Sequence, residues 1–166
     1  MTQEKSIQTR FIDEVLHYDS VIRRICFMYS SNAMPFDDLY QETMVNLWRG
    51  FSAFRGESSL STWVYRTAIN SCITWYRRNR RHFGSAPLDD SIDSIMACND
   101  DEHRRDLADM YKLISQLDPL EKAIIMMWLD ERSYDDIAEV TGLSHGAVAT
   151  RLHRIRQKLS RSENQH

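Results

Sequence analysis

Residues 133–159 concentrate the side chains of this chain that are best suited to contacting nucleic acid. No acidic residue occurs between Glu139 and Glu163. Guanidinium, ammonium, imidazole and hydroxyl groups can donate hydrogen bonds to phosphate oxygens and to base edges in the major groove of DNA. The side chains of these types are Thr150, Arg151, His153, Arg154, Arg156 and Lys158.

The spacing around these donors predicts a helix-turn-helix. Ala138 is small enough to let a second helix cross close by, and Gly142 suits the left-handed backbone that ends a helix. Ser144 is a good N-cap for the next helix. That helix has a single buried face at three- and four-residue spacing, made of Val148, Leu152, Ile155 and Leu159. A basic amphipathic helix is also typical of a solvated chain end, but the tight turn and acid-free face favour a DNA-recognition helix.

No catalytic or metal-binding pattern accompanies this motif. The six histidines are scattered, and no glycine-rich phosphate loop is present. Three cysteines without metal-ligand spacing do not make a disulfide framework. Cys26 and Cys72 fall in apolar helical runs and are predicted to be buried, whereas Cys98 lies in a polar segment as an exposed thiol. The chain is therefore predicted not to be an enzyme and to hold no metal or cofactor.

Charge is distributed unevenly along the 166 residues, although the formal net charge is only -3. Bases outnumber acids in residues 1–82, acids dominate residues 83–107, and the last segment has early acids and late bases. Two basic patches separated by an acidic strip fit a nucleic-acid-binding protein. The polar start is unlike a signal peptide, and no apolar run approaches the ~18 residues of a membrane span, so we expect a cytoplasmic protein.

Almost every apolar pattern in the chain follows the helical period, which predicts an all-α fold. The length permits two small domains, each with a core of its own. Helices are expected over residues 8–29, 37–51, 61–81, 106–116 and 120–130, before the helix-turn-helix. Asp37 or Asp38 is expected to cap the second of these helices. The predicted organisation is a helical bundle at 8–82, a flexible acidic linker at 83–105 with a short helical turn near 90–98, and a helix-turn-helix domain at 106–161.

The N-terminal block interleaves aromatic and basic side chains around a loop at residues 54–59. This combination suits single-stranded nucleic acid, whose bases stack on aromatic rings while its phosphates meet positive charge. Trp48 and Phe51 are predicted to be at least partly in the core. Trp63 fits the core and the surface equally well, and Tyr65 and Tyr76 can serve both because they keep a polar tip.

Two motifs together resemble a known family. Residues 37–51 (DDLYQETMVNLWRGF), 54–57 (FRGE) and 61–70 (STWVYRTAIN) resemble region 2 of bacterial sigma factors. Residues 117–123 (LDPLEKA) and the helix-turn-helix resemble region 4. A chain with only these two regions is similar to the extracytoplasmic-function (ECF) group of the sigma-70 family. The resemblance implies a factor that binds core RNA polymerase, recognises −10 and −35 promoter elements and directs transcription initiation.

The resemblance also implies partners and their positions. Region 2 of the family docks on the clamp helices of the largest polymerase subunit, and region 4 meets the flap. An anti-sigma factor controls many such proteins. The positions that match the polymerase contacts are Asp38, Gln41, Glu42, Asn46 and Arg49. Acids at a helix start suit a basic partner surface, although complementing the helix dipole also explains Asp37 and Asp38.

The family opens the −10 element with the loop and the helix that follows it, and it holds a flipped base in a prepared pocket. The matching positions are Phe54, Ser58, Ser59, Trp63, Tyr65, Arg66, Asn70, Arg77 and Arg78.

For the −35 element the matching positions are Ser144, Thr150, Arg151, His153, Arg154, Arg156 and Lys158. Arg154 suits a guanine edge and Thr150 a thymine methyl, whereas Arg151, Arg156 and Lys158 suit phosphates. Ala149 stands where several family members carry a base, which we expect to shift promoter preference.

Two other classes of protein fit parts of the pattern. A dimeric helix-turn-helix repressor or activator would bind duplex DNA tightly and ignore polymerase. An enzyme or ligand sensor fused to a DNA-binding tail would need a pocket with convergent polar groups. The sequence of the N-terminal block indicates no such pocket.

Overall fold

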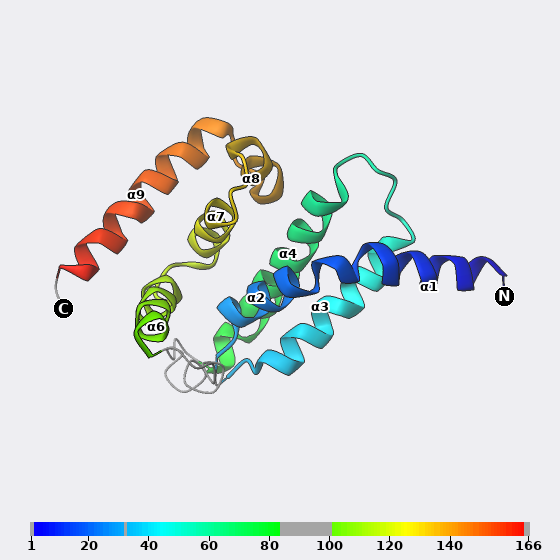
Figure 1. The fold of residues 1–166 in the computed structure, drawn as a ribbon, viewed down its shortest axis with the longest axis horizontal. Helices are drawn as coiled ribbons and strands as arrows, with labels where there is room; N and C mark the ends of the chain where they lie inside the picture. Colours follow the sequence, from blue (N-terminus) through cyan, green and yellow to red (C-terminus); the bar gives the residue numbers. More distant parts are fainter. Residues whose placement is uncertain (1, 32, 84–100, 165–166) are drawn as a thin grey trace.

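The computed structural model describes residues 2–31, 33–83 and 101–164, and its regular structure is helical apart from an isolated bridge between Ser31 and Met34 (Figure 1). The all-α prediction is confirmed. In chain order the elements are α1 (Thr2–Glu14), the 3₁₀ helix η1 (Leu16–Tyr18), α2 (Asp19–Tyr29), α3 (Phe36–Phe51), α4 (Leu60–Phe83), α6 (Asp101–Ser115), α7 (Pro119–Leu129), α8 (Tyr134–Thr141) and α9 (His145–Glu163).

The first predicted helix is wrong as a single element, because the backbone tightens into η1 and begins again at Asp19. Two side-chain contacts stabilise an acid at this new helix start: the Tyr40 hydroxyl donates to Asp19 at 2.5 Å, and Arg23 Nε donates at 2.7 Å. Burial tends to raise the pKa of Asp19, but these hydrogen bonds outweigh it and the pKa is lowered. The ionised carboxylate then complements the N-terminus of α2.

The N-terminal block, α1 to α4, has a core where α2, α3 and α4 pack together. Cys26 and Cys72 are fully buried in it, as predicted, and Cys26 Sγ lies 3.5 Å from Thr43 Oγ1. Burial raises the pKa of the Cys72 thiol well above its ordinary value, so this thiol stays protonated and unreactive. Phe51 is likewise buried, which confirms its predicted place in the core.

The predicted cap of α3 is wrong. Pro35 occupies the N-cap position, and Asp37 and Asp38 both lie inside the first turn, where no side chain caps the helix. Their charges still complement the helix dipole. Both residues are exposed on the surface.

The C-terminal block, α6 to α9, is organised around α7. Asp118 and Glu121 close a capping box at its start, with Pro119 at the first turn. Five consecutive residues of this helix, from Ala123 to Met127, are buried. Helix α6 begins at Asp101, five residues before the predicted start. Most of the predicted linker, including the expected turn at 90–98 and Cys98, lies outside the described residues.

The helix-turn-helix has the predicted chemistry. Gly142 ends α8 with a left-handed backbone at φ 75°, and the Ser144 hydroxyl accepts a hydrogen bond from the Ala147 N–H at 3.1 Å to cap α9. Val148, Leu152 and Ile155 are buried, and Leu159 packs against the core from its edge.

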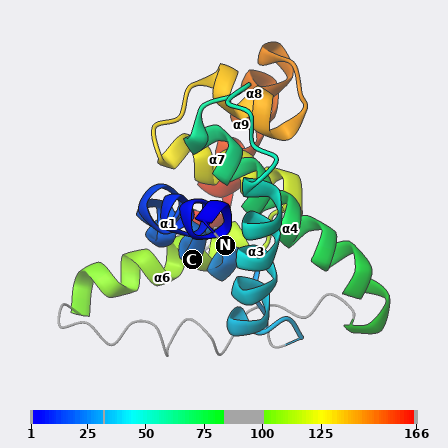
Figure 2. The same cartoon turned by 90° about the vertical axis from the view of Figure 1, so that its right-hand side faces the viewer.

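The prediction of two separate cores is wrong, because the two blocks share one apolar cluster. Helix α7 lies against α2 and α4, and α8 lies against α4. Both views show α7 and α8 beside α4 (Figures 1 and 2). The Tyr29 hydroxyl donates to the Pro119 carbonyl at 2.5 Å, and the rings of Phe27 and Tyr111 meet edge to face at 5.4 Å. The physical reason is the apolar circumference of α7 at residues 123–127, which the other three helices of its block do not cover alone.

The turn between α8 and α9 gives a direct test of the left-handed backbone at Gly142. We expect Gly142→Ala to lower the free energy of unfolding by about 1–2 kcal/mol, because a β-carbon is strained at positive φ. The matched control is Gly146→Ala in α9, where an added β-carbon meets no atom within 4 Å; it should be neutral or raise stability by about 0.5–1 kcal/mol. Urea unfolding of both variants measures the difference, and equal effects would contradict the assignment of the turn.

Candidate functional site

The outward face of α9 carries the exposed side chains of the predicted −35 surface, among them Thr150, His153 and Arg154. The Thr150 hydroxyl donates to the Gly146 carbonyl at 3.0 Å, which fixes its rotamer and leaves oxygen lone pairs to accept a bond. His153 Nε2 lies 3.1 Å from the Gln157 amide nitrogen. Arg154 has an exposed guanidinium, which suits it to a forked contact with a guanine edge.

Three of the four remaining predicted −35 residues have partners inside the protein. The Arg156 guanidinium lies 5.1 Å from the centre of the Trp128 ring in α7, and the Lys158 ammonium pairs with Glu121. Ser144 uses its hydroxyl as the cap of α9, and Arg151 is half-buried. Their DNA contacts stay predictions, and the contacts of Arg156 and Lys158 would require side chains to leave α7.

The exposed face of α3 carries the predicted polymerase contacts Asp38, Gln41 and Arg49. Sequence reasoning missed two apolar members of the same face. Val45 is 40% exposed and Trp48 is 43% exposed, although the Trp48 ring also meets Phe11 edge to face at 5.1 Å. Trp48 is therefore partly buried against the core, as predicted, but it also contributes an exposed apolar surface to this face. The available signal was the spacing along α3, because Val45 follows Gln41 by four residues and Trp48 follows Val45 by three. Exposed apolar side chains beside charges are typical of docking surfaces.

Two of the predicted polymerase residues, Glu42 and Asn46, line an open groove of about 330 Å³ between α3 and α4. The groove is shared with the predicted −10 residues Asn70 and Arg78. The Asn46 amide donates to the Ser71 hydroxyl at 3.0 Å, and that hydroxyl donates to the Thr67 carbonyl. Asn46 thus ties the two helices together instead of projecting into solvent.

The loop before α4 holds an aromatic cluster. The Trp63 ring centre lies 5.2 Å from that of Phe54 and 6.2 Å from that of Phe51. A β-carbon on Gly50 would lie 3.1 Å from the Trp63 ring, so glycine at that position leaves room for the indole. Trp63 is half-buried, which agrees with its ambiguous sequence pattern.

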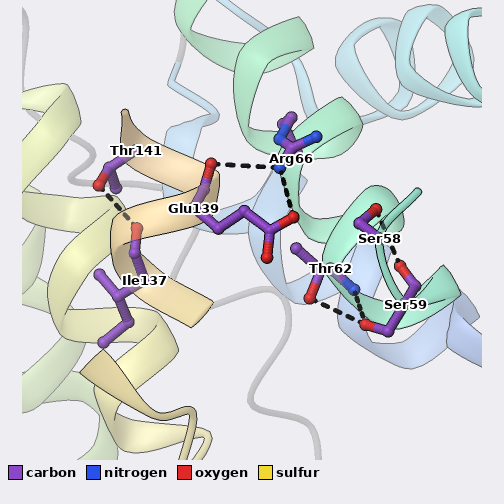
Figure 3. A network of polar contacts seen from close by, with 7 residues as sticks. All are labelled: Ser58, Ser59, Thr62, Arg66, Ile137, Glu139 and Thr141. Atoms are coloured by element: carbon purple, nitrogen blue, oxygen red, sulfur yellow. Dashed lines mark hydrogen bonds and ion pairs between the residues drawn. The ribbon is translucent and has the colours of Figure 1, made fainter. Parts of the chain in front are cut away.

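The serines of this loop have local structural partners. Ser59 caps α4, because its hydroxyl accepts from the Thr62 N–H at 3.1 Å. The Ser58 hydroxyl donates to the Ser59 carbonyl at 3.3 Å. Both side chains therefore shape the start of α4 (Figure 3).

Tyr65 and Arg66 face the C-terminal block. The Tyr65 hydroxyl donates to Asp130 Oδ2 at 2.6 Å, and Arg24 Nη2 binds the same oxygen at 2.5 Å. Arg66 Nη2 reaches the Glu139 carboxylate at 3.1 Å and its carbonyl at 3.2 Å (Figure 3). Tyr65 is only 3% exposed. Burial and the bond to Asp130 both raise the pKa of Tyr65.

The predicted −10 residues consequently lie in three places. Phe54, Ser58, Ser59 and Trp63 surround the loop, and Tyr65 and Arg66 lie at the contact between the blocks. The exposed residues Asn70, Arg77 and Arg78 lie farther along α4. Within the described part of the chain, no cluster of three His, Cys, Asp or Glu residues is arranged to hold a metal ion. Among the described helices, none combines the length and apolar character needed to cross a membrane.

Comparison with known proteins accounts for both blocks. Residues 15–82 match the family Sigma-70 region 2, and residues 107–159 match Sigma-70 region 4. The ECF RNA polymerase sigma-E factor of Haemophilus influenzae is 30% identical over 162 residues, covering 87% of this chain and 82% of that protein. RNA polymerase sigma factor YlaC of Bacillus subtilis is 28% identical over 163 residues, covering 95% and 90%.

A solved structure has the same fold. The sigma factor RpoE of Bartonella quintana, in complex with the anti-sigma factor NepR, superposes with a TM-score of 0.72 at 24% identity. The superposition covers 91% of this chain and 94% of that one.

The buried phenol predicts a pH dependence. Because the folded pKa of Tyr65 is raised, its hydrogen bond contributes fully below the unfolded pKa of about 10 and is lost as pH rises through the folded value. We expect the urea midpoint of the wild type to fall more steeply above pH 10 than that of Tyr65→Phe, which has no phenol to ionise. Urea midpoints measured from pH 8 to 11 test this, and parallel curves for the two proteins would contradict it.

Proposed function

Because this chain belongs to the ECF group of the sigma-70 family, whose members direct transcription initiation, we propose specific surfaces for its polymerase and promoter contacts. One observation best supports the assignment of polymerase and promoter contacts to different surfaces. The exposed face of α3 and the acid-free outer face of α9 stand on different blocks of one chain, so polymerase docking and −35 reading use separate helices.

The proposed polymerase surface is the outer face of α3, with Asp38, Gln41 and Glu42 at its acidic end and Val45 and Trp48 in its middle. Arg49 ends the surface. Acidic side chains steer a basic partner, and the exposed indole supplies apolar area at the centre of the contact. Asn46 supports this surface from behind through its bond to Ser71.

The proposed −35 reader is α9 in the major groove of duplex DNA. Thr150, His153 and Arg154 face the bases, and Arg151 contacts phosphate. Arg156 and Lys158 join the phosphate contacts after leaving Trp128 and Glu121. This arrangement follows the recognition helix of other helix-turn-helix proteins.

The proposed −10 surface begins at the aromatic loop, where Phe54 and Trp63 offer rings on which an unstacked base rests. Asn70, Arg77 and Arg78 extend it along α4 toward the upstream duplex. The protein therefore acts as a non-enzymatic specificity factor in the cytoplasm, where polymerase and promoter DNA are found.

A regulatory protein partner is also proposed. The sigma factor RpoE, which has this fold, has a solved structure in complex with the anti-sigma factor NepR. CnrH, which has the same fold, has one in complex with the cytosolic domain of CnrY. We infer that an anti-sigma factor binds this chain too.

Reconstituted transcription tests the function directly. Core polymerase with the purified chain should initiate at a defined set of promoters, which sequencing of the transcript starts identifies by their shared −10 and −35 elements. A repressor or activator would instead bind duplex DNA alone and give no start sites with core polymerase.

The two surfaces should be separable by substitution. Arg154→Ala should reduce promoter-specific transcription about 10- to 100-fold, corresponding to the roughly 1–3 kcal/mol of a base contact, while polymerase affinity is unchanged. Arg161→Ala, an exposed arginine in the last turn of α9, is its control. Loss of polymerase binding by Arg154→Ala would refute this separation.

A charge reversal on α3 should have the opposite effect. Asp38→Lys with Glu42→Lys should raise the Kd for core polymerase about tenfold or more, because both lysines repel a basic partner surface. The matched control is Asp106→Lys with Asp109→Lys, which reverses two exposed acids on α6. Fluorescence titration with core polymerase measures the Kd, and equal effects of the two double variants would exclude α3 as the docking face.

A further inference from the structure

One histidine at the start of the proposed −35 reader has no part in the surfaces assigned above. His145 is the first residue of α9, and its side chain is 62% exposed. The imidazole Nδ1 lies 2.7 Å from Oδ1 of Asp135, in the first turn of α8. The Asp135 side chain is itself 84% exposed. Because such an exposed pair stabilises a fold only slightly, its main effect is to orient the imidazole ring.

The carboxylate determines which ring nitrogen of His145 carries a proton. An ionised carboxylate can only accept a hydrogen bond, so His145 Nδ1 donates to Asp135. In the neutral imidazole the other nitrogen, Nε2, then has a free lone pair. The Tyr134 ring lies beside the imidazole, with the two ring centres 5.4 Å apart. His145 therefore presents an oriented hydrogen-bond acceptor to solvent.

His153, farther along α9, has the opposite tautomer. Its Nε2 lies 3.1 Å from the amide nitrogen of Gln157, and an amide nitrogen can only donate a hydrogen bond. His153 Nε2 therefore accepts, and the ring proton is on Nδ1. The two imidazoles of α9 thus differ in what they offer to a ligand, because His145 has a free acceptor and His153 has a free donor.

The position of His145 suits contact with a base edge. Recognition helices bring their N-terminal residues to the bases of the major groove. Among residues 145–149, His145 alone has a polar side chain, and Ala149 lies four residues later on the same side of the helix. The donors that bases expose in the major groove are the amino groups of adenine and cytosine. An acceptor at His145 Nε2 matches these two bases.

We propose that His145 is a specificity residue of the −35 reader, that its Nε2 accepts a hydrogen bond from the amino group of an adenine or a cytosine, and that Asp135 is the positioning residue that keeps this nitrogen unprotonated. This inference rests on the proposed promoter function and deepens it. It adds a reader in the first turn of α9 to Thr150, His153 and Arg154, and it gives α8 a part in base selection.

The test measures transcription by core polymerase with the full chain, on promoters whose −35 positions are varied one base pair at a time. It is run at about pH 8, where an ordinary histidine is neutral. Where adenine or cytosine is preferred, it is replaced by the analogue that lacks only the amino group, which is unsubstituted purine or pyrimidinone. Because the analogue also weakens base pairing, the informative quantity is the ratio of its effect on the wild type to its effect on a variant.

Each variant has a matched control. His145→Ala is compared with His17→Ala, which removes an exposed imidazole from η1. Asp135→Asn is compared with Asp136→Asn, which removes the same charge from the neighbouring residue in the first turn of α8. Circular dichroism establishes that each variant is folded.

We expect loss of the amino group, at one −35 position, to lower wild-type transcription about three- to tenfold more than transcription by His145→Ala, which is the size of one uncharged hydrogen bond. Asp135→Asn should lose the same discrimination, because an amide can donate to Nδ1 and thereby move the ring proton to Nε2. His17→Ala and Asp136→Asn should keep it.

Two results with His145→Ala would overturn the proposal. One is an equal effect of the analogues on the wild type and the variant at every −35 position. The other is a uniform loss of transcription on all promoters, which indicates a phosphate contact or a structural role. Wild-type discrimination in a folded Asp135→Asn chain overturns it too, and this variant decides the question alone if His145→Ala does not fold. Failure of the wild type to start transcription at any promoter is a different result, which refutes the proposed function.

Discussion

Helix α7 imposes the constraint on which the rest of the molecule depends. Its residues from Ala123 to Met127 are buried in succession, so apolar side chains surround the middle of the helix on every side. A helix that is apolar all round must be enclosed by other elements. Helices α8 and α9 cover one side, and α2 and α4 of the other block cover part of the remainder. The union of two sequence blocks into one core follows from this helix more than from any ion pair.

Opposite charges are separated within the C-terminal block in a way that fits this enclosure. The acids Asp130 and Glu139 bind arginines of the N-terminal block, whereas Arg154 of α9 is exposed on the outer face. A near-neutral chain therefore presents positive charge to DNA and uses negative charge for its internal contact. The same separation of charge places Tyr65 beside Asp130 at the contact between the blocks, where it is inaccessible, and leaves Arg154 exposed on the outer face.

Local chemistry was predictable from the sequence, and long-range packing was not. The Gly142 turn and the Ser144 cap depend on neighbouring residues, so their patterns predicted them. The break at η1 depends on Tyr40, twenty-one positions beyond Asp19, and the burial of Tyr65 depends on a helix from the other block. Periodicity within one helix does not reveal which second surface will cover it. Trp48 illustrates the converse, since a large aromatic in an apolar run packs on Phe11 and still keeps 43% of its surface exposed.

The place of Gly50 against Trp63 has a consequence for binding entropy. A glycine inside a helix weakens it by roughly 1 kcal/mol relative to alanine, yet here the missing β-carbon lets the indole lie against α3. The ring is also held between Phe51 and Phe54. Trp63 is thus held by its neighbours in the free protein, and a base that stacks on it in the proposed −10 contact does not bear the cost of ordering that side chain. The lack of a β-carbon at Gly50 therefore preorganises the aromatic loop, at the expense of some stability of α3.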